Sequence, residues 1–340
     1  QGSLADIQSL LDRHADIKAF DIRDHTPLHH ASSNGHRQCV KILLDHGADV
    51  TARDNDKFTP VHRASRNGHH QCIELLLDRH ADVNARDLDN DTPLHHASSK
   101  GHHQCIEILL DHGADVNARD HNDDVPLHRA SSAGYHQCVK ILLDHGADVT
   151  ARDNDKFTPV HRASRNGHHQ CIELLLEQHA DTDARDSFHA TPLHYAAISG
   201  YHQCIEILLD HGADIHVRGV QYNTPLHYAS LNANRRCIEI LLDYGADKSL
   251  INVRLPLSLS LSLSLSLSQS MCKHLSHECI NNHQSIPTHH SHSLISHQIN
   301  GHTPAQCAKD SSIVELIQNH GTSIHPSIDP SIHPSIHPSI

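Results

Sequence analysis

Four residues near the C-terminus of this 340-residue chain carry side chains that bind zinc: Cys272, His274, His277 and Cys279. Thiolate and imidazole are the usual ligands of a structural zinc ion. The spacing of these four residues matches no familiar zinc-binding pattern, and the flanking sequence is biased in composition. We therefore expect no bound metal ion and no cofactor.

Sequence motifs of common catalytic sites are missing. The chain has no glycine-rich phosphate-binding loop and no Gly-x-Ser-x-Gly nucleophile elbow. Its unusual feature is its 41 histidines, because an unperturbed imidazole gains a proton below about pH 6.5. Most of them recur at fixed positions, so we interpret them as structural copies. A metal or pH sensor built on them is an alternative.

A 33-residue period positions nearly all of these side chains. A Thr-Pro-Leu-His start, or a close variant of it, recurs at positions 26, 59, 92, 125, 158, 191 and 224. Pro suits the first turn of a helix, and the preceding Thr can cap that helix. A Gly such as Gly68 then allows a reversal of the chain. The apolar spacing of Cys39, Val40, Leu43 and Leu44 predicts a second helix with one buried face.

This pattern resembles the ankyrin repeat, a 33-residue unit of two helices and a loop. The resemblance implies an all-α repeat fold, an ankyrin-repeat solenoid of stacked helix-turn-helix units with β-hairpin-like loops. His14, His80 and His179 replace the helix-ending Gly, and we expect them to adopt positive φ with little strain. Val125 replaces the capping Thr at an expected cost of about 1 kcal/mol. Ala233 replaces the inter-helix Gly, so the seventh repeat should be the least regular.

The sequence predicts four segments. Residues 1–250 form the array, a half repeat followed by seven complete repeats. Residues 251–300 are a Leu/Ser- and His-rich insertion of low complexity, predicted to be disordered, and residues 301–321 are a degenerate terminal ankyrin-like unit. Residues 322–340 form a Ser-Ile-His-Pro repeat tail, also predicted to be disordered. The chain begins in mid-repeat without an initiating Met, so we expect a fragment of a longer protein.

Composition limits the partners and the compartment. The net charge of −13 and the 3% aromatic content disfavour nucleic-acid binding. The Leu-Ser run is too interrupted by Ser to favour a membrane span. Seven cysteines share one apolar helix position, and buried thiols indicate a reducing, cytoplasmic setting. These cysteines are Cys39, Cys72, Cys105, Cys138, Cys171, Cys204 and Cys237. We expect a monomer.

One stretch resembles a catalytic centre. His69, His70 and Cys72 are similar to part of the Asp-His-His-Cys centre of protein palmitoyltransferases, some of which carry ankyrin repeats. Here the stretch lies on a predicted repeat helix whose Cys faces the core. We therefore interpret it as structural and expect no enzymatic activity.

The ankyrin resemblance implies a partner-binding surface. In ankyrin-like stacks, the residue after the Thr-Pro-Leu-His start and those just before the inter-helix Gly line a concave groove. The corresponding residues here are His30, Arg63, Arg66, His96, Arg129, Arg162, Arg165, Tyr195, Ile198, Tyr228 and Leu231. This set is basic in its middle and apolar-aromatic toward its C-terminal end, and the adjoining loop tips, for example Asp54 and Asp87, read as acidic.

We therefore predict a non-enzymatic scaffold that binds a protein or peptide through the groove and the loop tips. The expected partner has an acidic stretch followed by apolar side chains. The alternative is that the array is the interaction arm of a longer enzyme or adaptor, such as a kinase, a ubiquitin-ligase subunit or a palmitoyltransferase.

Overall fold

The computed structural model describes residues 15–250 and residue 316 of the chain. Over these residues the secondary structure is entirely helical, without a strand, which confirms the predicted all-α repeat fold. The helices are α2 (Pro27–Ser33), α3 (Arg37–Asp45), α4 (Pro60–Arg66), α5 (His70–Leu77), α6 (Pro93–Lys100), α7 (His103–Asp111), α8 (Pro126–Ala133), α9 (His136–Asp144), α10 (Pro159–Asn166), α11 (His169–Glu177), α12 (Pro192–Ser199), α13 (His202–Asp210), the 3-10 helix η1 (Val220–Tyr222), α14 (Pro225–Leu231) and α15 (Arg235–Asp243).

The chain divides into two compact units. Unit 1 comprises Gln1–Ser187 with Asp210–Gly212, and unit 2 comprises Phe188–Leu209 with Ala213–Ile340. Each unit is built from the same helix pair, a first helix that begins with Pro and a second helix rich in Leu and Ile.

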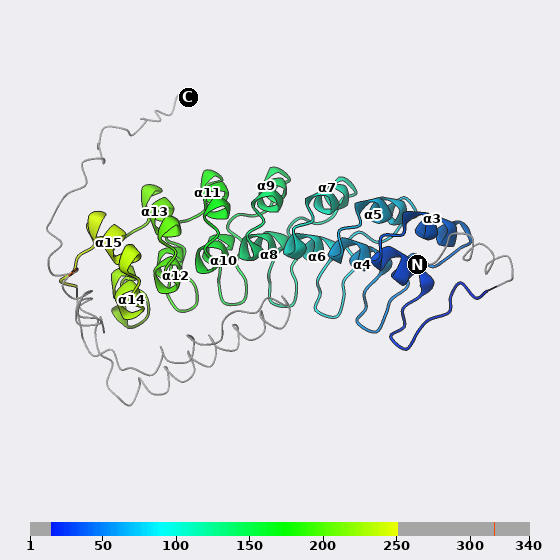
Figure 1. Ribbon diagram of the computed structural model, residues 1–340, viewed down its shortest axis with the longest axis horizontal. Helices are drawn as coiled ribbons and strands as arrows, with labels where there is room; N and C mark the ends of the chain where they lie inside the picture. Colours follow the sequence, from blue (N-terminus) through cyan, green and yellow to red (C-terminus); the bar gives the residue numbers. More distant parts are fainter. Residues whose placement is uncertain (1–14, 251–315, 317–340) are drawn as a thin grey trace, which may run out of the picture. The chain divides into compact units, whose positions relative to one another are not determined.

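Unit 1 consists of two rows of helices (Figure 1). The first helices α2, α4, α6, α8 and α10 pack one against the next, and the second helices α3, α5, α7, α9 and α11 form the other row. Side chains such as Val61, Ile73 and Leu76 are fully buried where the rows meet. A single pair could not cover this apolar surface, so neighbouring repeats stabilise one another. In unit 2, α12 packs against α14, and α14 against α15.

The ends of the helices follow from the repeat sequence. Thr59 precedes α4 in an extended conformation, and Pro60 takes the first helical position. Gly101 ends α6 at φ 76°, a left-handed conformation that costs glycine little. His80 and His179 adopt φ values of 64° and 62°, as expected for the His that replaces Gly. Ala233 also adopts a positive φ, 55°, which carries some strain and agrees with the expected irregularity of its repeat.

A buried histidine joins the first helix to the following repeat at α2, α4, α6 and α8 of unit 1 and at α12 of unit 2. His62 Nδ1 lies 3.1 Å from the Thr59 backbone N and 2.9 Å from the Thr59 hydroxyl. The Nε2 of the same ring lies 3.2 Å from the backbone oxygen of Asp91, 29 residues further along the chain. Since Nδ1 accepts from the N–H of Thr59, the proton of the neutral ring is on Nε2 and is donated to Asp91.

The bonding of these histidines explains why Val125 is tolerated at a capping position. Its backbone N–H still donates to His128 Nδ1 over 3.2 Å, although the hydroxyl contact made by Thr elsewhere is lost. His128 Nε2 lies 3.0 Å from the carbonyl oxygen of Phe157, so the bond to the next repeat is kept.

Several predictions fall outside the described residues. These are the N-terminal part of the half repeat with His14, the insertion at 251–300 with its zinc-like Cys272, His274, His277 and Cys279, the terminal unit at 301–321 apart from residue 316, and the tail at 322–340. The segment boundaries stay predictions. Among the described helices, none has the length and apolar content to cross a membrane.

Replacing the bridging histidine should weaken the array. We expect His62→Ala to lower the free energy of unfolding by about 1–3 kcal/mol, because it removes the acceptor of the buried Thr59 N–H and one of the two donors to the carbonyl of Asp91, the other being the Asp87 N–H. His136→Ala removes an exposed imidazole at the start of α9 and should change stability by less than about 0.5 kcal/mol. Urea unfolding followed by circular dichroism measures both. Equal losses for the two variants would contradict the bridging role.

Candidate functional site

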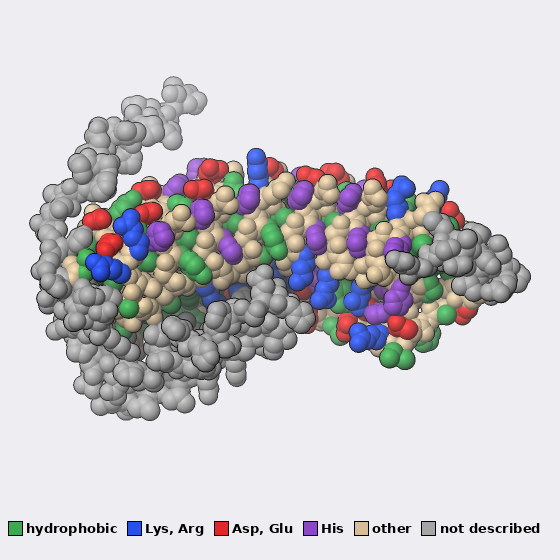
Figure 2. All heavy atoms as spheres, in the orientation of Figure 1, with side chains coloured by type: hydrophobic (Ala, Val, Ile, Leu, Met, Phe, Trp, Pro, Cys, Tyr) green, Lys and Arg blue, Asp and Glu red, His purple; other side chains and the backbone are tan. Residues whose placement is uncertain are grey.

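The predicted partner-binding residues of unit 1 lie on its first helices, one helical turn or less from the bridging histidines. Figure 2 shows Lys and Arg side chains gathered beside α4 and α6 on this part of the molecule, with Asp and Glu near them. We call the surface formed by α2, α4, α6, α8 and α10 and the loops before them the first-helix face.

A row of ion pairs runs along the first-helix face. In each repeat of unit 1, the residue after the bridging His contacts an Asp nine residues earlier in the preceding loop. The distances are 3.0 Å for His30–Asp21, 2.5 Å for Arg63–Asp54, 2.8 Å for His96–Asp87 and 2.7 Å for Arg162–Asp153, and Arg129 pairs with Asp120 in the same way. We call these five contacts, three made by arginine and two by histidine, the cation–aspartate row; the two histidines carry a charge only when protonated. It fixes each loop to the helix that follows it.

The pairs are linked around Arg129 and Arg162. Arg162 Nη2 lies 3.3 Å from Asp124 Oδ1 as well as 2.7 Å from Asp153 Oδ2, so two buried carboxylates share one guanidinium. Burial raises the pKa of Asp153 to about 6, with the Asp124 charge adding to the effect. Burial also opposes ionisation of Asp124, but the positive charges of Arg162 and Arg129 outweigh it and lower the pKa of Asp124 to about 2. Asp124 therefore stays ionised to lower pH than Asp153 does.

The row changes the interpretation of the predicted groove residues. Arg162 and Tyr195 are buried, with 6% and 5% of their surface exposed, so neither presents much surface to a partner. Arg63, His96 and Arg129 are half-buried in their pairs. Asp54 and Asp87 are buried, as are the loop residues Asp120, Asp124 and Asp153, so the prediction that such carboxylates form acidic loop tips is wrong for these five residues. Asp56 and Asp89, two residues further along their loops, stay exposed, at 67% and 68%.

Two predicted arginines of unit 1 lie outside the row. Arg66 is exposed at the end of α4, and Arg165 is half-buried on α10, 99 positions further along the sequence. Neither makes an ion pair within the described residues. The guanidinium of Arg66 lies 5.9 Å from the centre of the Phe58 ring. Burial lowers the pKa of Lys100, and the nearby charge of Arg66 lowers it further. Arg66 and Lys100 thus form a positive pair.

In unit 2, the predicted residues on α12 and α14 are apolar or aromatic. Ile198, Tyr228 and Leu231 are half-buried, unlike Tyr195. The Tyr228 ring stacks edge-on against the bridging His194, with the ring centres 5.7 Å apart. This surface offers apolar contact area without charge.

A second row of arginines was missed by sequence reasoning. Their guanidinium Nη1 atoms donate to the carbonyl oxygen of the equivalent arginine in the following repeat, over 2.5–2.9 Å. The donors are Arg53, Arg86, Arg119 and Arg152, and all four are exposed. An Ala-Arg-Asp triplet at 33-residue spacing is the signal that could have identified them.

The palmitoyltransferase-like stretch has no catalytic thiol. Cys72 is buried, with 1% of its surface exposed, and desolvation raises its pKa to about 11. The seven cysteines of the described residues that share its helix position are all free and buried. A thiol of this kind is a poor nucleophile, because the thiolate is the reactive form.

The repeat geometry agrees with comparisons to known proteins. The profile of the family described as "Ankyrin repeats (3 copies)" matches residues 1–87, 84–153 and 160–252. The chain belongs to the ankyrin-repeat family. Among solved structures, it is similar to the crystal structure of the human ASB11 ankyrin repeat domain, at 29% sequence identity and a TM-score of 0.61. The alignment covers 64% of this chain and 97% of that domain.

A comparison with curated proteins found no match. Ankyrin repeats are generally protein-interaction modules, and the fold is typically non-catalytic.

The two kinds of arginine should differ in what they contribute to stability. Arg162→Ala leaves two buried carboxylates without their shared cation, so we expect a loss of about 3–5 kcal/mol in the free energy of unfolding. Arg66→Ala, its matched control, should cost less than about 0.5 kcal/mol. Thermal and urea unfolding of the two variants test this. A small effect of Arg162→Ala would show that the buried row contributes little to stability.

Proposed function

We propose that this chain is a non-enzymatic ankyrin-repeat scaffold that binds a protein or peptide partner through the first-helix face and the exposed loop tips. The observation that carries the proposal is the contrast between the paired and the unpaired arginines of unit 1. Arg63, Arg129 and Arg162 are neutralised by aspartates. Arg66 and Arg165 are not, and they extend from the same helices as Arg63 and Arg162.

An acidic partner segment fits this face of unit 1. Arg66 and Lys100 repel each other, and an incoming carboxylate would relieve that repulsion. Arg is also favoured at interface hot spots, since its planar fork pairs with carboxylates over two hydrogen bonds. The exposed arginines at 53, 86, 119 and 152 add positive charge along the loops of the same unit.

We assign binding of apolar partner side chains to residues of unit 2. Tyr228 and Leu231 lie half-exposed on α14, and Ile198 lies half-exposed on α12. Tyr offers a large contact area with little loss of side-chain entropy, which suits it to an interface. Of the predicted contact residues, Arg162 and Tyr195 are buried, and His30, Arg63, His96 and Arg129 contact aspartates, so these six are assigned a supporting role. Arg66 and Arg165 form the proposed contact surface of unit 1, and Ile198, Tyr228 and Leu231 form that of unit 2.

We also infer that the protein works as a monomer in a reducing, cytoplasmic compartment. Support comes from the seven free cysteines that lie buried in the second helices of the described residues. Buried free thiols spread through a core are typical of proteins that never meet an oxidising environment.

Peptide selection tests the proposed function. A random peptide library is displayed on phage and selected on the immobilised full chain, and the affinities of the enriched peptides are measured by calorimetry. We expect the enriched peptides to be acidic and to lose at least about tenfold in affinity, or about 1.4 kcal/mol, for the double variant Arg66→Glu/Arg165→Glu. Leu231→Asp should weaken peptides that also carry apolar residues.

The double variant Arg37→Glu/Lys41→Glu is the matched control, because Arg37 and Lys41 are both exposed on the second helix α3, away from the first-helix face. It makes the same change in net charge as Arg66→Glu/Arg165→Glu and should alter affinity by less than about twofold, as distant surface charges do. If the control weakens peptide binding as much as Arg66→Glu/Arg165→Glu does, the effect comes from net charge alone and the proposed site is wrong.

A further inference from the structure

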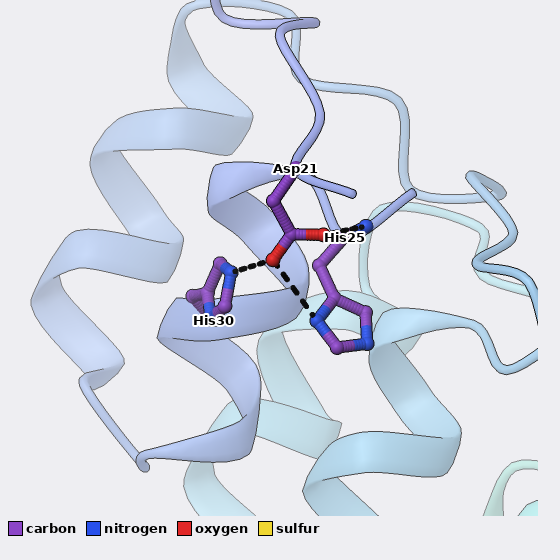
Figure 3. A group of neighbouring side chains, drawn as sticks. All are labelled: Asp21, His25 and His30. Carbon is purple, nitrogen blue, oxygen red and sulfur yellow. Dashed lines mark hydrogen bonds and ion pairs between the residues drawn. The ribbon is translucent and has the colours of Figure 1, made fainter. Parts of the chain in front are cut away.

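Three possible metal ligands meet at the start of unit 1: Asp21, His25 and His30 (Figure 3). Asp21 and His25 lie in the loop before α2, and His30 lies on α2 itself. Both imidazole rings point one nitrogen toward the same carboxylate oxygen of Asp21 (Figure 3). This cluster is the first pair of the cation–aspartate row with a second histidine added.

The distances suit a transition-metal ion. Asp21 Oδ2 lies 3.0 Å from His30 Nε2 and 3.3 Å from His25 Nδ1, and all three atoms lie within 4.8 Å of one another. Zinc bonds to nitrogen and oxygen are about 2.0–2.1 Å long, so the ligands of a tetrahedral ion are about 3.3 Å apart. A small adjustment of the side chains would place one ion among the three atoms.

Hydrogen bonds from the backbone favour the ionised form of the Asp21 carboxylate. Asp21 Oδ1 accepts hydrogen bonds from the backbone N–H groups of Arg23 and His25 over 2.8 and 3.0 Å, which leaves Oδ2 to face the histidines. These two backbone donors stabilise the charged form of the carboxylate.

A second carboxylate, that of Asp54, lies near the other ring nitrogen of His25. Its Nε2 lies 3.4 Å from Oδ2 of Asp54, whose side chain is 1% exposed. A metal-binding histidine usually donates its other N–H to a carboxylate or a carbonyl, which fixes the ring. Arg63 Nη2, a donor that is also paired with Asp54, lies 3.0 Å from the same nitrogen, so in the metal-free structure Nε2 accepts from Arg63 and the proton of a neutral ring is on Nδ1, toward Asp21. Metal binding at Nδ1 would move this proton to Nε2, which would then donate to Asp54, and Arg63 would keep only its pairing with Asp54.

The equivalent positions in other repeats of unit 1 cannot form this site. Arginine replaces His30 at positions 63, 129 and 162, and a guanidinium does not bind metal ions. The other two ligand groups in the described residues, Asp87–Asp91–His96 and Asp91–His95–Asp120, have one histidine each. In both, Arg129 already lies beside a carboxylate, at 3.6 Å from Asp91 and in the pair with Asp120.

We propose that Asp21 Oδ2, His25 Nδ1 and His30 Nε2 bind one divalent transition-metal ion of the zinc class. Imidazole nitrogens favour zinc, copper and nickel over calcium and magnesium. The side chains of Asp21 and His30 are 39% and 56% exposed, so the fourth position stays open to water or to an outside ligand. A bound ion would fix the loop before α2 to that helix. The proposal is independent of the proposed function.

The test compares the full chain with His30→Arg, which gives the first repeat the residue found at the equivalent position of three others. The variant places a permanent cation beside Asp21, so its unfolding temperature without metal should match or exceed that of the parent. Zinc titration by calorimetry, after chelator treatment and at neutral pH, should show one saturable site in the parent that is weakened more than about 100-fold in His30→Arg. Loss of even an outer partner of a metal ligand costs about 10–100-fold.

His136→Arg makes the same substitution at an exposed position on α9 and controls for binding by the many other histidines. It should leave the site intact, and zinc should raise the unfolding temperature of the parent and of this control but not of His30→Arg. Cobalt(II) should give the absorption of a nitrogen- and oxygen-ligated ion in the parent, which His30→Arg abolishes. If His30→Arg binds zinc with the affinity and stoichiometry of the parent, or if the parent has no saturable site, the proposal is wrong.

Discussion

The structure depends on a neutral histidine buried at the start of each first helix. It holds the helix start through Nδ1, and in His29, His62, His95, His128 and His194 it also holds the next repeat through Nε2, so one side chain connects local structure to stacking. Desolvation lowers the pKa of His62 to about 3 and of His128 to about 4, and it lowers those of His29 and His95 as well. The unfolded chain, with pKa values near 6.5, takes up protons first, so this stability is complete above about pH 6.5 and is lost as the pH falls toward 4.

A second constraint follows from the first. Once the histidine fixes the helix start, the side chain of the residue after it points at the loop of its own repeat. There it contacts an aspartate that lies nine residues earlier in the sequence. Arg63, Arg129 and Arg162 pair with these aspartates and therefore have a structural role. The surface left for recognition is one turn further along the helix, at Arg66 and Arg165. The same first-helix face therefore contains residues that hold the loops and residues that are free to contact a partner.

Much of the fold could be predicted from the sequence, because its signals are local and repeated. Thr59-Pro60 predicts a helix start from backbone chemistry alone. The positive φ of His80 could be predicted because Gly occupies the equivalent position in the neighbouring repeats. Exposure could not be predicted in the same way. Arg63, Arg129 and Arg162 look alike in sequence, yet Arg162 is 6% exposed whereas Arg63 and Arg129 are half-buried, because exposure depends on how the loops of neighbouring repeats pack around each side chain. The meeting of His25 with Asp54 likewise depends on how two loops pack, which no local pattern encodes.

The most direct test of the account is the ionisation of the bridging histidines, measured by long-range proton–nitrogen NMR correlation on the full chain, with His62→Ala and His128→Ala used for assignment. The result that we predict is a set of neutral rings protonated on Nε2 that stays neutral while the exposed histidines titrate near pH 6.5. If His62 and His128 instead gain a proton near pH 6.5 while the chain stays folded, they are not buried bridges between repeats, and the proposed basis of the stack is wrong.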